Sequence, residues 1–191
     1  MTSSLELYTS PQSFFRDHVV EALARLRLDV GVWTEFYLVD LLARKAPSLP
    51  MDQPLVTQLG ACLENPRPFA RFEGYRTLGD ASLLLLGFFG DNVPRRGVNR
   101  SYVASMGRNA YAATAALSGS YDGLTAAYED LSEGFTEFAR VLDEVREMTS
   151  LRTPQDLLEL YSRWKQTKSP NVAGRLCLGG MLFIPDLEDE N

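Results

Sequence analysis

Residues 72–89 read FEGYRTLGDASLLLLGFF, the most apolar stretch of the chain, and they decide its predicted fold class. A short basic loop, PRRGVNR at residues 94–100, follows, and then SYVASMGRNAYAATAAL at residues 101–117. The first segment has the composition of a buried helix, and the second that of a helix whose small residues permit close packing. Two such helices joined by an arginine loop predict the centre of an all-helical domain.

Three glycines, Gly74, Gly79 and Gly87, lie inside the first of these predicted helices. A glycine within a helix costs about 1 kcal/mol relative to alanine, so each needs a packing reason or marks a kink.

Apolar residues recur at helical spacing along the rest of the chain. This spacing predicts a first helix that opens at residues 10–11 and breaks near residues 29–31. It predicts further helices over residues 32–46, 55–63 and 124–148, and others beginning near residues 154 and 170. Residues 36–42 are apolar nearly all round, which predicts that the second helix is buried on most sides. The fold class is therefore all-α, a single-domain bundle of about six to eight helices over residues 1–191. Residues 1–9 form an N-terminal extension in this prediction, and residues 186–191 form a mobile acidic tail.

Two helix faces stand out within this bundle. The region 124–148 carries apolar residues at alternating spacings of four and three, a heptad seam that we expect to pack against helices of the same chain. The seam consists of Leu124, Tyr128, Leu131, Phe135, Phe138, Leu142 and Val145. On the helix over residues 101–117, an apolar stripe is predicted at Tyr102, Met106, Ala110, Ala113 and Leu117. A neighbouring face has only small residues, Ser105, Asn109, Ala112 and Ala116.

The charge and composition restrict the function. A net charge of −6 argues against general nucleic-acid binding and against docking on an anionic membrane, because both need a basic face. Residues 83–89 form the longest apolar run, which is far shorter than the ~20 residues of a membrane-spanning helix, and no signal peptide is visible at the N-terminus. A cytoplasmic location is expected, where Cys62 and Cys177 would be reduced thiols.

The sequence predicts no catalytic residue, cofactor or metal site. His18 is the single histidine, which excludes sites that need two imidazoles. Glycine-rich nucleotide loops and hydrolase motifs are missing as well. The least favoured hypothesis is an enzyme that uses Asp80 or Asp40 as a base.

Asp40 and Asp80 each interrupt an apolar helical run, and a buried carboxylate needs a partner. Arg44 lies one turn after Asp40, and Arg76 lies one turn before Asp80, so structural ion pairs are the first interpretation. In the alternative, one carboxylate lines a polar pocket together with the tyrosines Tyr37, Tyr75 and Tyr111.

The loop at residues 94–100 concentrates positive charge at Arg95, Arg96 and Arg100 in an otherwise acidic chain. One interpretation is a solvated loop, or one that pairs with the acidic face of the 124–148 region. The other is an anion site or a partner contact, since guanidinium groups suit carboxylates and phosphates.

Several short stretches together carry a resemblance to a protein family. They are FYLVDLL at residues 36–42, LGD at 78–80 with GFF at 87–89, and Tyr102 with MG at 106–107 and AY at 110–111, joined by Leu176, Gly180 and Pro185. Over roughly residues 32–185 the chain resembles a family of small uncharacterised bacterial cytosolic proteins. The resemblance implies a single compact domain and assigns no activity.

Two functional hypotheses lead. The first is a non-enzymatic helical interaction or regulatory protein, with an unknown protein partner or a second copy of the chain in a homodimer. The second is a small-ligand-binding protein whose anionic ligand meets the arginine loop. The candidate ligand- or partner-binding residues are Arg95, Arg96, Arg100, Asp80 and Tyr111.

Overall fold

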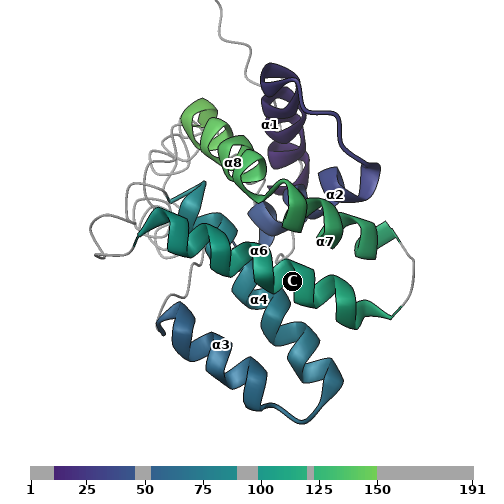
Figure 1. Cartoon of the computed structure of the whole chain (residues 1–191). Coiled ribbons are helices and arrows are strands. Elements are labelled where there is room, and N and C mark those ends of the chain that lie inside the picture. Colours follow the sequence, from purple (N-terminus) through teal and green to yellow (C-terminus); the bar gives the residue numbers. More distant parts are fainter. Residues whose placement is uncertain (1–10, 46–52, 90–98, 120–122, 150–191) are drawn as a thin grey trace, which may run out of the picture.

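The computed structural model describes residues 11–45, 53–89, 99–119 and 123–149. These residues form seven α-helices and no strand, which confirms the all-α fold class (Figure 1). The helices are α1 (Pro11–Leu26), α2 (Val32–Lys45), α3 (Leu55–Glu64), α4 (Pro68–Leu86), α6 (Arg100–Ser118), α7 (Gly123–Glu133) and α8 (Phe135–Thr149). The predicted helices near residues 154 and 170, the N-terminal extension and the acidic tail lie outside the described residues. No helix in the described ranges is long and apolar enough to cross a bilayer.

Local sequence signals explain where α4 begins and where α6 begins and ends. Pro68 occupies the first turn of α4, where its missing amide hydrogen costs nothing. Asn99 caps α6, and its side-chain oxygen accepts a hydrogen bond from the Ser101 amide at 2.8 Å. Gly119 ends α6 with a φ of 70°, a left-handed conformation that glycine adopts without steric cost.

Helices α4 and α6 pack along each other at the centre of the molecule (Figure 1). A Cβ at Gly79 would lie 2.8 Å from the Tyr111 ring, so glycine lets this tyrosine approach the α4 backbone. A Cβ at Gly107 of α6 would overlap the Phe135 ring and lie 2.8 Å from the Cβ of Ser82. The predicted packing reason for a glycine within α4 is therefore present at Gly79.

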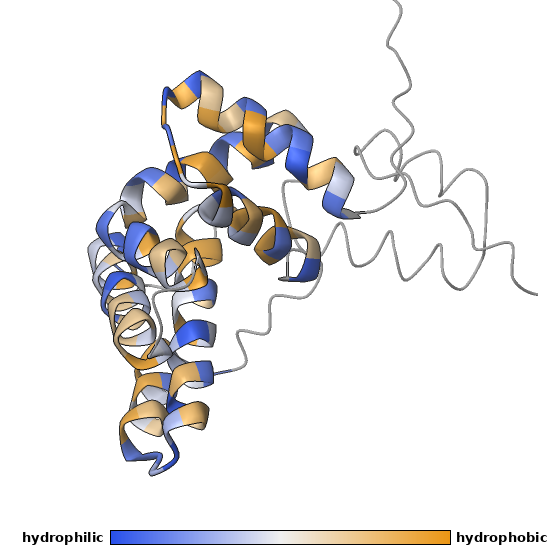
Figure 2. Cartoon of the chain, turned by 90° about the vertical axis from the view of Figure 1, so that its right-hand side faces the viewer, coloured by the Kyte–Doolittle hydropathy of each residue, from blue (hydrophilic) through white to orange (hydrophobic). Residues whose placement is uncertain are grey.

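The other helices cover this central pair. Helix α3 packs on α4 at one end of the molecule, whereas α1, α2 and α8 gather at the other end (Figure 1). Helix α7 packs on both α6 and α2. Hydrophobic and hydrophilic residues share the surfaces of the helices, as expected where one side of a helix faces a core (Figure 2).

The predicted seam is buried within the chain, but it does not lie on one helix. Gly134 separates α7 from α8, so the helix predicted over 124–148 is wrong as a single element. Along the seam Leu124 is exposed, and the other members are buried: Tyr128, Leu131, Phe135, Phe138, Leu142 and Val145.

Two predicted faces differ from the structure. On α6, the predicted stripe holds at Met106 and Ala110, which are buried, but Ala113 and Leu117 are half-buried and Tyr102 is exposed. The side that packs inward consists of Val103, Met106, Gly107, Ala110, Tyr111 and Thr114. The face of small residues is exposed at all four positions, Ser105, Asn109, Ala112 and Ala116. On α2, the predicted burial on most sides is confirmed for Tyr37, Leu38, Val39, Leu41 and Leu42, whereas Phe36 is exposed. Within the ranges that the structure describes, Val32, Trp33 and Phe36 of α2 remain exposed.

Candidate functional site

Asp80 lies in a buried cluster that joins α4 to α2 and α6. Its side chain is 1% exposed. The Tyr37 hydroxyl donates a hydrogen bond to Asp80 Oδ1 at 2.5 Å, and the Tyr111 hydroxyl donates to the same oxygen at 3.0 Å. The Tyr37 and Tyr111 rings meet edge-to-face at 6.2 Å, and Tyr128 stacks on Tyr111 at 6.3 Å. The predicted association of one carboxylate with tyrosines is thus present for Asp80, Tyr37 and Tyr111. The group is a buried cluster and not the predicted pocket, and Tyr75, also predicted there, is buried on α4 but is not one of the donors to Asp80.

The two phenols in this cluster are held in the protonated form. Burial raises the pKa of Tyr37 and of Tyr111 well above the usual value near 10, and the negative charge of Asp80 raises both further. A neutral phenol can donate its hydrogen to a carboxylate, whereas a phenolate cannot. The cluster therefore works as a set of hydrogen-bond donors around one acceptor.

The ionic partner predicted for Asp80 is engaged elsewhere. Arg76 Nη2 pairs with Glu73 Oε2 at 2.5 Å, so the prediction of an Arg76–Asp80 pair is wrong. Glu73 and Asp80 are both within one helical turn of Arg76. The more exposed Glu73 loses less hydration when it pairs with Arg76. For Asp40 the prediction holds, because Arg44 donates to it one turn along α2.

Asp80 and Tyr111 are inaccessible to a ligand in this conformation, since Tyr111 is 0% exposed and Asp80 is nearly so. Of the five residues predicted as one site, these two form an internal polar centre. Arg100 lies apart from them at the protein surface, where its Nη2 donates to the Leu86 carbonyl at 3.2 Å. Arg95 and Arg96 lie outside the described residues.

Arg100 lines a groove of about 390 Å³ between the end of α4, the start of α6 and α8. Two further arginines, Arg108 of α6 and Arg140 of α8, line the same groove. Sequence reasoning missed both, because they lie outside the basic loop and 32 positions separate them in the chain. For Arg108 the sequence did hold a usable signal, because Arg100 and Arg108 are about two helical turns apart on α6.

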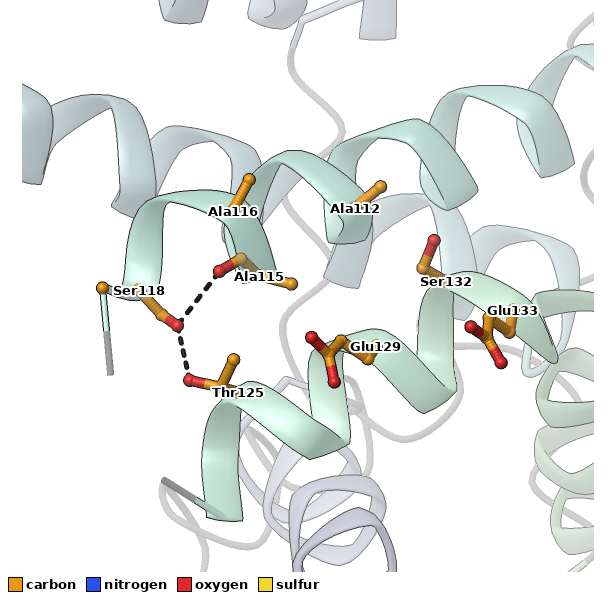
Figure 3. A pocket seen from close by; sticks show the side chains of 9 residues that line it. Ala112, Ala115, Ala116, Ser118, Thr125, Glu129, Ser132 and Glu133 are labelled. Atoms are coloured by element: carbon orange, nitrogen blue, oxygen red, sulfur yellow. Dashed lines mark hydrogen bonds between the residues drawn. The ribbon is translucent and has the colours of Figure 1, made fainter. Parts of the chain in front are cut away.

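A second pocket, of about 560 Å³, lies between α6 and α7 (Figure 3). The α6 wall carries only alanine and serine side chains, while α7 contributes Glu129 and Glu133 together with hydroxyl groups. Ser118 links the two helices through a 2.5 Å hydrogen bond between its Oγ and Thr125 Oγ1. Glu129 and Glu133 are one turn apart and exposed, an arrangement common on solvated helix surfaces.

A third feature is an apolar groove of about 710 Å³ between α1 and α2. Val32 and Phe36 line it and are 81% and 56% exposed, and the buried Val39 completes its apolar part. Trp33, 52% exposed, lies next to Phe36 with the two rings edge-to-face at 6.3 Å.

Comparisons with known proteins add no family to this description. No family model, curated protein or solved structure matches the chain. In the ranges that the structure describes, no group of three or more histidine, cysteine or acidic side chains is arranged to hold a metal ion.

Proposed function

We propose that this chain is a non-enzymatic interaction protein whose α1–α2 groove binds a basic amphipathic helix of a partner protein. The observation that carries the proposal is the exposure of large apolar side chains on α2 in the described part of the chain. Large apolar side chains gathered at a protein surface, rimmed by polar groups, are typical of protein-binding sites.

The apolar residues form one continuous set on α2. Val32 and Phe36 are one turn apart and line the groove. Trp33 packs against Phe36 and lies outside the groove lining, with its ring close to Gly123 of α7. Tryptophan and other aromatic side chains dominate the binding energy of many protein interfaces, because they bury large areas with little loss of side-chain freedom. An apolar stripe of a partner helix, with residues three and four apart, suits a groove between two helices.

The polar rim of the groove favours a basic partner. Asp17, Glu35 and Asp40 line the groove with Arg16. Arg16 pairs with Glu35 at 3.6 Å and Arg44 pairs with Asp40, so Asp17 gives the rim its excess negative charge. The net charge of the whole chain is −6, so the long-range field also attracts cations. Complementary charge increases the association rate and excludes acidic partners.

The test uses the full chain and two labelled helical peptides that present leucine on one face. One peptide carries lysine on the other face, and the second carries glutamate. Fluorescence anisotropy should show binding of the lysine peptide only, and Phe36→Ala should weaken it about tenfold, the effect of losing roughly 1.4 kcal/mol of contact energy. The melting temperature should hardly change, because Phe36 is mostly exposed.

Phe69→Ala is the matched control, since Phe69 is 75% exposed on α4 and lies outside the α1–α2 groove. General attraction of a basic peptide to an acidic protein would persist in both variants. Equal binding by parent and Phe36→Ala would therefore overturn the proposal. Light scattering at several concentrations tests for a homodimer. If the chain dimerises and Phe36→Ala abolishes the dimer, a second copy of the chain is the occupant of the groove.

A further inference from the structure

The groove between α4, α6 and α8 carries an unusual concentration of positive charge. Its polar lining consists mainly of Arg100, Ser101, Ser105, Arg108, Thr136 and Arg140. We propose that it binds the phosphoryl group of a small phosphorylated molecule.

Helical spacing brings the arginines together. Arg100 and Arg108 are two turns apart on α6, and Arg140 projects from α8, which packs against α6. Arg100 is held in place by the hydrogen bond from its Nη2 to the Leu86 carbonyl at the end of α4. The three guanidinium groups thus approach one groove from two helices.

Two of the three arginines of this groove have no acidic partner among the residues that the structure describes. Asp143 is the single carboxylate among the described lining residues, and it pairs with Arg146 at 2.8 Å. In the part of the chain that the structure describes, neither Arg108 nor Arg140 forms an ion pair. Like charges at one groove repel each other, and a bound anion would relieve that repulsion.

The remaining groups suit a phosphoryl group in particular. Guanidinium forks donate two parallel hydrogen bonds to phosphate oxygens, and the hydroxyls of Ser101, Ser105 and Thr136 can donate to the third oxygen. The groove also borders the first turn of α6, whose dipole places positive potential there. Leu86, with two alanines, forms the apolar part of the wall, and the volume of about 390 Å³ leaves room for a small organic group.

The experiment measures calorimetric binding of inorganic phosphate, phenyl phosphate and sulfate to the full chain. Phosphate and phenyl phosphate should bind, with phenyl phosphate tighter, and sulfate should bind as well, because its tetrahedral oxygens suit the same donors. Arg108→Ala and Arg140→Ala should each weaken phosphate binding by roughly ten- to a hundredfold, the range for losing a hydrogen bond to a charged group. Both arginines are exposed, so the melting temperature should stay near that of the parent.

Arg67→Ala is the matched control, because Arg67 is an exposed arginine outside the groove and its loss changes the net charge equally. Unchanged phosphate affinity in Arg67→Ala supports the assignment. Equal weakening in all three variants would mean a general charge effect and would overturn it. No binding of phosphate or of its ester would also overturn it.

Discussion

Replacing Asp80 with asparagine tests whether the buried cluster stabilises the fold through its charge. The substitution keeps the size of the side chain and an oxygen that can accept from Tyr37 and Tyr111, but it removes the negative charge. A hydrogen bond to a charged group contributes about 1.5–3 kcal/mol, and a neutral one contributes about 1 kcal/mol. Two bonds weakened in this way predict that Asp80→Asn lowers the free energy of unfolding by about 2 kcal/mol.

Tyr111→Phe isolates one of these bonds, because it removes the hydroxyl and keeps the ring packed against Gly79. We expect a loss of about 1.5–3 kcal/mol in the parent and of about 1 kcal/mol in the Asp80→Asn background. The difference, about 1 kcal/mol, is the coupling energy between the two side chains. Tyr102→Phe is the control, since Tyr102 is on the same helix but exposed, and it should change stability by less than about 0.5 kcal/mol.

Urea unfolding at 25 °C, followed by circular dichroism, gives the four free energies of this cycle. Additive losses would show that Tyr111 and Asp80 do not interact energetically. A silent Asp80→Asn would refute the structural role altogether, and Asp80 would then return to the list of candidate binding residues. Either result would contradict the hydrogen bonds at 2.5 and 3.0 Å on which the calculation rests.

Two further predictions concern packing and pH. Gly107→Ala should destabilise the protein by about 1–3 kcal/mol in urea unfolding, because the new methyl overlaps Phe135, whereas Gly60→Ala should stabilise it by up to about 1 kcal/mol, since no atom lies within 4 Å of its Cβ position. Destabilisation by both would point to a backbone effect rather than overlap. The raised pKa values of Tyr37 and Tyr111 favour the unfolded state at high pH, because unfolded tyrosine ionises from about pH 10 while the folded phenols stay protonated. The two protonated phenols stabilise the fold fully below about pH 10. Above about pH 10 each tyrosine should lower the free energy of unfolding by about 1.4 kcal/mol per pH unit, and Tyr111→Phe should reduce this slope. An unchanged slope in Tyr111→Phe would contradict the burial argument.

The helical elements could be predicted from local signals, because proline, glycine and apolar spacing act within a few residues. Pro68 and Gly119 mark the start of α4 and the end of α6 as these rules require. The break at Gly134 was missed because the heptad spacing continues across it. A seven-residue spacing indicates which residues face inward. It does not indicate whether the helix axis is interrupted between them.

The site was harder to predict because its contacts are distant in the chain. Apolar flanks indicated that Asp80 is buried, but Tyr37 and Tyr111 are 43 and 31 positions away. Local spacing favoured Arg76, which pairs with Glu73. The sequence alone is enough to predict that Asp80 is buried. The packing of α2, α4 and α6 determines which side chains form hydrogen bonds to it.

Burial also separates the roles of the residues that the sequence grouped together. A buried carboxylate such as Asp80 costs free energy unless its hydrogen bonds are made, so its loss must appear in stability. Exposed arginines such as Arg108 and Arg140 contribute little to stability, because water already solvates their charge. Their loss should therefore appear in binding and not in the melting temperature. Arg100 lies between these cases, since its hydrogen bond to Leu86 ties the arginine groove to the same helix that carries Asp80.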